Sequence, residues 1–177
     1  ERIICASNAV ICISGDVRKE EVLPLLEKHL GGMRAGTPPA LTPTPALRAG
    51  REVAVLDKQQ AVLVVGVPGV DVASPEMAQA LLFQSWCCDM AGPVFTNIRE
   101  EAGLAYYASS SLFIGMDAGG ICFYLGTSPE QLEEAGRRLE KTLEKIEEQG
   151  MTEDEQERTR AAALSSHLLA MQSNGTL

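Results

Sequence analysis

Histidine is almost absent from this sequence, which contains only His29 and His167. The two stand far apart, and neither belongs to an H-x-x-E-H or H-E-x-x-H pattern, in which one helix supplies both zinc ligands and a general base. We therefore expect no metal site and no catalytic residue in this chain alone. His29 lies in the last turn of an expected helix, and His167 lies among apolar helix positions, so we interpret both as structural.

Signatures of covalent catalysis are also missing. No G-x-S-x-G elbow occurs, and the glycine dipeptides lack the lysine and Ser/Thr of a phosphate-binding loop. The five cysteines form no C-x-x-C pair. Unpaired cysteines in apolar or helical surroundings favour reduced thiols, so the sequence predicts a cytoplasmic protein.

Long apolar runs and an excess of positive charge are lacking as well. No stretch approaches the roughly 18 apolar residues of a membrane span, so we expect no membrane partner. Fifteen basic and 24 acidic residues give a net charge of -9, which opposes binding to nucleic acid. The chain begins at Glu1 without an initiator methionine or a secretory signal, and we expect the natural product to extend further upstream.

What the sequence does contain is a series of apolar segments separated by glycine and proline. The run 34–50 holds four prolines and two glycines and is predicted to be an extended linker. Helix starts are indicated by Asp16, by Ser74 and by the capping-box patterns at 128–131 and 152–155. The expected strands are 8–14, 52–56, 60–67, 104–115 and 119–126, and the expected helices are 17–30, 75–90, 94–102, 129–149 and 152–171.

The order of these elements predicts the fold class. Short turns between successive strands favour antiparallel pairing, and the amphipathic helices each offer one apolar face to a sheet. We therefore predict an α+β sandwich with a mostly antiparallel sheet and helices packed on one face.

The segment FTNIREEAGLAYYASSS, residues 95–111, offers the clearest candidate site. Arg99 near a helix end and Tyr106 near the next strand are seven positions apart across a tight turn at Gly103. Arginine contributes permanent charge and fixed donors, and tyrosine contributes a hydroxyl, so the pair could grip a peptide carbonyl. The same residues also fit a purely structural helix end followed by a strand.

The run IREEAGLAY resembles the R-E-x-x-G-L-A-Y signature of the second domain in the pitrilysin/insulinase superfamily, which includes the mitochondrial processing peptidases. Other segments resemble the family in the same order: VICISGDV with the helix that ends in LGG, the proline-rich linker, the strand QAVLVVGVPG, and the two late capped helices. The resemblance implies a unit at 1–33 that completes a preceding domain, a linker at 34–50, and a C-terminal peptidase-family domain at 51–177 that is cut short at its end.

The resemblance also implies roles and partners. Zinc would be bound in a separate N-terminal domain or partner subunit, and Arg99 and Tyr106 would hold the backbone of a peptide substrate. This chain departs from the family in CCDMAGPVF, where Pro93 stands at the place of an arginine. Tyr107 is interpreted as a packing or rim residue, and Glu100 and Glu101 as solvated charges or as groups that orient Arg99.

Two functions therefore remain open. The chain is either the zinc-free half of a metallopeptidase, contributing substrate-binding groups and a chamber wall, or a non-catalytic assembly module of the same superfamily. The resemblance further implies that the second domain lacks its last strand and helix, which would leave a sheet edge unpaired. Residues 8–30 could dock on this edge, within the chain or by exchange between chains, or stay loosely packed, and two chains could join there as a homodimer.

Overall fold

A computed structural model of the chain describes residues 3–40, 42–45 and 48–173. The chain divides into two compact units. One comprises residues 1–43 with 166–177, and the other comprises residues 44–165. The division at 43/44 falls inside the proline-rich segment.

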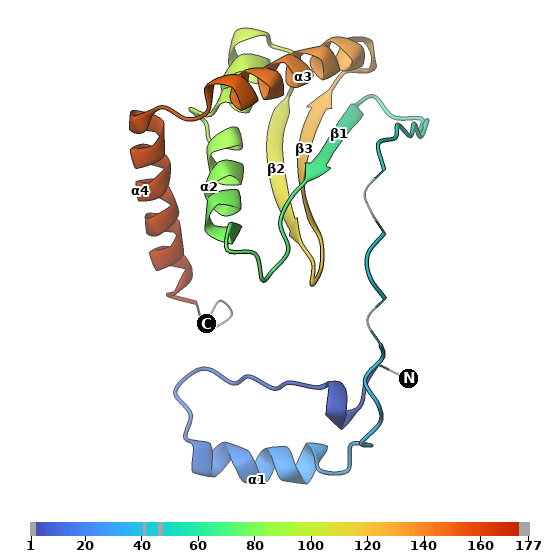
Figure 1. The fold of residues 1–177 in the computed structure, drawn as a ribbon, viewed down its shortest axis with the longest axis vertical. Coiled ribbons are helices and arrows are strands. Elements are labelled where there is room, and N and C mark those ends of the chain that lie inside the picture. Colours follow the sequence, from blue (N-terminus) through green and yellow to red (C-terminus); the bar gives the residue numbers. More distant parts are fainter. Residues whose placement is uncertain (1–2, 41, 46–47, 174–177) are drawn as a thin grey trace. The chain divides into compact units, whose positions relative to one another are not determined.

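The larger unit is built on a three-stranded antiparallel sheet with the order β1-β3-β2 (Figure 1). The strands are β1 (Ala61–Pro68), β2 (Tyr107–Ile114) and β3 (Gly119–Thr127). β3 is central, and its Tyr124 stands opposite Val64 of β1 and Ser109 of β2. Since side chains alternate between the two faces of a strand, this register fixes which residues share a face.

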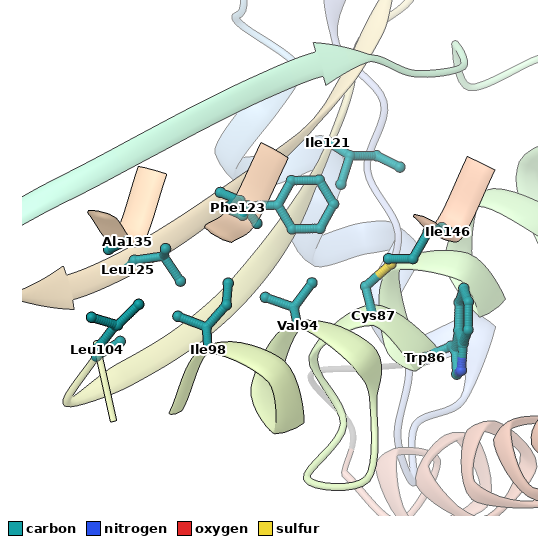
Figure 2. Packing of buried hydrophobic residues seen from close by; sticks show 12 residues of the cluster. Trp86, Cys87, Val94, Ile98, Leu104, Ile121, Phe123, Leu125, Ala135 and Ile146 are labelled. Carbon is teal, nitrogen blue, oxygen red and sulfur yellow. The ribbon is translucent and has the colours of Figure 1, made fainter. Parts of the chain in front are cut away.

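Helices cover one face of the sheet and enclose the core. α2 (Met77–Cys88) contacts β2, α3 (Leu132–Gln149) contacts β1 and β3, and the π-helical turn η2 (Phe95–Glu101) lies between β2 and α3. Figure 2 shows β3 directing its alternate residues toward these helices. The core residues drawn together there include Ile121, Phe123, Leu125, Val94, Ile98, Ala135 and Ile146. The predicted α+β fold is confirmed.

The two late helices follow the predicted capping signals. A short 3-10 turn, η3 (Pro129–Gln131), leads into α3, which ends at Gly150 with φ +64°. α4 (Glu153–Ala170) then begins at a complete capping box. The Glu155 N–H donates to Thr152 Oγ1 at 3.3 Å, and Thr152 N–H donates back to Glu155 Oε2 at 2.8 Å.

The smaller unit contains η1 (Ala6–Asn8) and α1 (Lys19–Leu30). Two backbone hydrogen bonds join the segment before α1 to the segment after it. Ala6 N–H donates to the carbonyl of Arg34 at 2.9 Å, and Ser7 N–H donates to that of Ala35 at 3.1 Å. Gly36, with φ +64°, lies against Cys5, and a Cβ at this glycine would stand only 2.4 Å from the Cys5 Cβ.

Two predicted strands are wrong. The predicted strand 8–14 does not form, because Asn8 ends η1 and residues 9–14 have no strand, and the predicted strand 52–56 does not form either. Both segments have β-type composition, but the described strands pair only among themselves, and an extended segment without a neighbour forms no ladder. β1 accordingly pairs with β3, not with a preceding strand.

Two helix starts also differ from the prediction. α1 begins after Arg18, not Asp16, and α2 begins at Met77. Ser74 still accepts a 3.2 Å hydrogen bond from Glu76 N–H, but it does so in the turn that precedes the helix.

Candidate functional site

Arg99 and Tyr106 lie at the two ends of a tight turn between η2 and β2. Arg99 is in the last turn of η2, and Tyr106 directly precedes the first residue of β2. Gly103 N–H donates to the Arg99 carbonyl at 3.2 Å, and Leu104 N–H donates to the Ile98 carbonyl at 3.0 Å. The two bonds are nested, as in the Schellman motif that ends many α-helices. Each bond here spans one residue more than in that motif, because the π-helical turn is wider than an α-helical one.

Two further bonds fix the backbone that carries Tyr106. Tyr106 N–H donates to the Gly126 carbonyl at 2.7 Å, and the buried hydroxyl of Thr127 donates to the Leu104 carbonyl at 2.6 Å. Leu104 and Ala105 are buried, whereas Tyr106 is 60% exposed. The phenol therefore stands on a rigid base and remains accessible.

The Arg99 guanidinium is supported by an aromatic ring on its own helix. Its Cζ lies 4.8 Å from the centroid of Phe95, a cation–π distance, and its Nε is 4.0 Å from Glu100 Oε1. The arginine side chain is 45% exposed. Stacking on one ring face limits the positions that the guanidinium can take without removing it from solvent.

Arg138 of α3 ties η2 to the helix layer. Its Nε donates to the Asn97 carbonyl at 3.3 Å, and its Nη2 is 3.2 Å from Glu101 Oε2. Glu100 thus lies beside Arg99, and Glu101 is paired with Arg138. Phe95, Arg138 and Thr127 were not predicted from the sequence. The spacing of Phe95 and Arg99, four residues on one helix, was a signal for the first of them.

The turn before η2 is rebuilt around Gly92 and Pro93. Gly92 N–H donates to the Asp89 carbonyl at 2.7 Å, and a Cβ at Gly92 would stand 2.0 Å from the carbonyl oxygen of Trp86. Asn97 Nδ2 then donates to the Pro93 carbonyl at 2.8 Å. Backbone groups and Asn97 organise this turn, at the place where the resembled family carries an arginine.

The two histidines and the other possible metal ligands form no second candidate site in the described residues. Across residues 3–40, 42–45 and 48–173, no group of three or more His, Cys, Asp or Glu lies where it could hold a metal ion. His29 and His167 both lie in the last turns of helices, α1 and α4. Among the helices of this described part, none has the length and apolar character needed to cross a membrane.

Chemically, the η2–β2 turn presents a fixed cation and a phenolic donor to solvent. Both groups are hydrogen-bond donors at neutral pH, so they suit an acceptor such as a peptide carbonyl or a developing oxyanion. Neither is a base or a nucleophile, and binding or polarisation is the chemistry that this pair can supply.

Comparisons with known proteins agree with this architecture. The family described as "Peptidase M16 inactive domain" matches residues 2–163. A protein of Bacillus subtilis described as an uncharacterized zinc protease is 23% identical over 170 residues, covering 96% of this chain and 41% of the relative. A Rickettsia bellii protein of the same description is 26% identical, covering 94% of this chain and 40% of the relative.

Solved structures show the same fold. The peptidase M16 inactive domain from Pseudomonas fluorescens superimposes with a TM-score of 0.77 at 20% identity, covering 86% of this chain and 38% of that chain. A protease from Helicobacter pylori gives a TM-score of 0.75 at 16% identity, covering 92% and 41%. This chain thus spans about two-fifths of the length of the relatives it matches. The resemblance to the pitrilysin/insulinase superfamily is confirmed, and the chain belongs to the peptidase M16 inactive-domain family.

Proposed function

We propose that this inactive domain is the C-terminal, zinc-free half of a metallopeptidase, in which it binds the backbone of a peptide substrate through Arg99 and Tyr106 and forms one wall of the reaction chamber. The observation that carries the proposal is the η2–β2 turn. It holds an exposed guanidinium and an exposed phenol on a buried, hydrogen-bonded base, in a chain whose matched relatives are described as zinc proteases.

The partner in this proposal is an N-terminal zinc-bearing half. The matched relatives are more than twice as long as this chain, which leaves room for such a half. α1 buries none of its residues, and a pocket of about 310 Å³ in the smaller unit is lined by apolar side chains that include Ile11, Ile13 and Leu26. An isolated helix of twelve residues is marginal in water, so this unit needs further protein to pack against.

The zinc-bearing half would carry out the chemistry. Zinc bound in that half would supply an activated water for peptide hydrolysis. Arg99 and Tyr106 would hold the substrate from the opposite side and donate to oxygens whose negative charge grows in the transition state. The cytoplasm is the compartment we propose for the enzyme, because the sequence has an odd number of cysteines and no C-x-x-C pair.

The test is turnover of the full-length protein that contains this chain. Tyr106→Phe removes one hydroxyl, and Arg99→Lys keeps the charge but removes the planar fork. Each variant should reduce kcat by roughly 100- to 1000-fold, the scale for loss of one transition-state donor. Arg137→Lys is the matched control, because Arg137 pairs with the neighbouring Glu134 on the exposed side of α3 and should leave turnover unchanged.

The alternative function is an assembly module without a catalytic role. In that case the Arg99 and Tyr106 variants would alter the stability or the sedimentation of the complex and leave peptide turnover as it was. Equal turnover in wild type and both variants would remove the proposed role.

A further inference from the structure

Phe95 is a large aromatic residue that the hydrophobic core does not use. Val94 and Ile98, which flank it in the chain, are fully buried and lie in the core cluster (Figure 2). Phe95 is half-buried, and among the described residues it belongs neither to that cluster nor to the apolar side chains packed against it. Core packing therefore does not explain why a phenylalanine stands at this position.

The ring of Phe95 instead faces the guanidinium of Arg99. The Cζ of Arg99 lies over this ring, 4.8 Å from its centroid, and both residues belong to η2. The N–H donors of a guanidinium lie in its plane and point outward. Contact through the face of the group therefore leaves its donors available to an acceptor such as a substrate carbonyl.

Little else restrains the guanidinium. Glu100 Oε1 is 4.0 Å from its Nε, which is beyond hydrogen-bond distance, and the Glu100 side chain is 61% exposed. An ion pair so open to water restrains its partners weakly. In the part of the chain that the structure describes, this pair and the Phe95 ring are the only polar or aromatic interactions of the guanidinium.

Tyr106, the other residue of the candidate site, is held in a different way. Its backbone is fixed to β3 by the hydrogen bond from its N–H to the Gly126 carbonyl, and its side chain has few rotatable bonds. The Arg99 guanidinium stands at the end of a long, flexible side chain. Its place therefore depends on what it contacts, and the contact is the ring of Phe95.

We propose that Phe95 is the positioning residue of the candidate site. The face of its ring fixes the Arg99 guanidinium in the place from which it donates to the backbone of the substrate. The inference rests on the function proposed above and deepens it, because it assigns part of substrate binding to a residue that acts through Arg99.

The physical reason is that a group already held in place loses less freedom when the substrate binds. Immobilising one flexible side chain on binding lowers affinity by about two- to tenfold. The negative face of an aromatic ring attracts the cation before the substrate arrives and so reduces this loss. A leucine at position 95 would keep the apolar volume but would lack that negative face.

The experiment measures kcat/KM for peptide cleavage by the full-length protein in which residue 95 is phenylalanine or its mono-, di- or trifluorinated form. Fluorine withdraws electron density from the ring face and changes the size of the ring little, so each fluorine weakens the attraction for the cation. The logarithm of kcat/KM should fall in proportion to the number of fluorines, to a total loss of about two- to tenfold. Phe95→Leu should show the same total loss, and Phe95→Tyr, which keeps the ring face, should stay close to wild type.

Two controls separate positioning from packing. Arg99→Gln removes the cation, so kcat/KM in that background should be low and should not change with fluorination of residue 95. Phe83→Leu is the matched aromatic control, because Phe83 of α2 packs against the core and lies 6.1 Å from Trp86, centroid to centroid. It should lower stability and leave kcat/KM unchanged at a temperature where the protein is folded.

The outcomes separate this inference from the function on which it rests. A graded loss that disappears in the Arg99→Gln background supports the positioning role. A flat fluorine series, in a protein whose turnover Arg99→Gln lowers, would overturn the role of Phe95 and leave the proposed function standing. Equal slopes with and without Arg99 would also overturn that role, because the ring would then act without the guanidinium. Unchanged turnover in Arg99→Gln would contradict the proposed function itself, and this inference with it.

Discussion

The Thr127 hydroxyl on β3 donates a 2.6 Å hydrogen bond to the carbonyl of Leu104, two residues before Tyr106. Both residues are buried, so this bond joins the central strand to the turn that presents the candidate phenol. The geometry of the site therefore depends on a residue that lies outside the motif.

Replacing Thr127 tests that dependence. Thr127→Val keeps the shape but leaves the buried Leu104 carbonyl without this donor, and we expect a loss of about 1–3 kcal/mol. Thr127→Ser keeps the donor and loses one methyl group, for which about 1 kcal/mol is expected. Hydrogen exchange of the β3 amides in the full-length protein measures both values. Equal losses in the two variants would mean that the hydrogen bond contributes little.

A second prediction concerns Gly103, which has φ +61° and where an added Cβ would meet no other atom within 4 Å. Gly103→Ala should cost about 1–2 kcal/mol through backbone strain alone, because Ala at positive φ is disfavoured. Gly150→Ala is a matched control, since Gly150 has φ +64° and equally open surroundings at the end of α3.

The two glycine variants should differ in function although Gly150→Ala loses at least as much stability, because φ +64° and ψ −162° at Gly150 lie in a region open almost only to glycine. Gly103→Ala shifts the turn between Arg99 and Tyr106, so KM and kcat for peptide cleavage should both worsen. Gly150→Ala should leave them unchanged at a temperature where both proteins are folded. Identical kinetics for the two would contradict the role of the turn.

The third prediction concerns pH. Hydrogen bonds from the Thr152 backbone N–H, then from the Thr152 hydroxyl, and more weakly from Trp86, hold the pKa of the Glu155 carboxyl below its ordinary value of 4.5. Because the folded pKa lies below the unfolded one, the stabilisation is complete above pH 4.5 and is lost as the pH falls through the folded pKa.

Glu155→Gln exposes this contribution. The variant should melt at a lower temperature than wild type at neutral pH, and the difference should shrink as the pH falls below 4.5, because the wild-type carboxylate becomes protonated. Thermal melts of both proteins across the acid range measure it. A difference that stays constant with pH would assign the effect to packing against Trp86.

A fourth prediction concerns the proline-rich segment. Asp117, in the turn between β2 and β3, accepts hydrogen bonds from Thr44 N–H and Thr44 Oγ1, each at 2.7 Å. Thr44 stands between Pro43 and Pro45, which have no N–H to donate, so the aspartate accepts from the one backbone N–H of these three residues.

Asp117→Ala should therefore speed hydrogen exchange at the Thr44 amide and increase proteolytic cleavage in this segment, with little change in the sheet. Asp89→Ala is the control, because Asp89 also accepts a backbone bond, from Met90 N–H, in a different loop. Unchanged exchange at Thr44 in Asp117→Ala would show that the anchor has no effect.

The sequence was a good guide wherever local signals act alone. The capping box at Thr152 and Glu155, the stop at Gly150 and the hairpin of β2 and β3 all rest on interactions between near neighbours, and each is confirmed. The signature around Gly103 likewise indicated a turn, and the structure gives that turn the bonds that place Arg99 and Tyr106 at its ends.

The sequence was a poor guide wherever a strand must pair with another strand that is distant in the chain. The apolar run 9–14 has the composition of a strand, but strand formation needs a neighbour, and composition does not say whether one exists. The pairing of β1 with β3, about sixty residues apart, was missed for the same reason. The sequence predicts that strands 52–56 and 60–67 join through a short turn at Asp57-Lys58, but that hairpin does not form.

By itself, the sequence determined the family and the ends of the two late helices, and it indicated the two residues of the candidate site, because each is encoded in short motifs or capping patterns. Only the tertiary structure decided that Phe95 stacks on Arg99 and that Thr127 and Arg138 fix the turn. These features depend on strand register and on helix packing, which bring together residues that no local pattern connects.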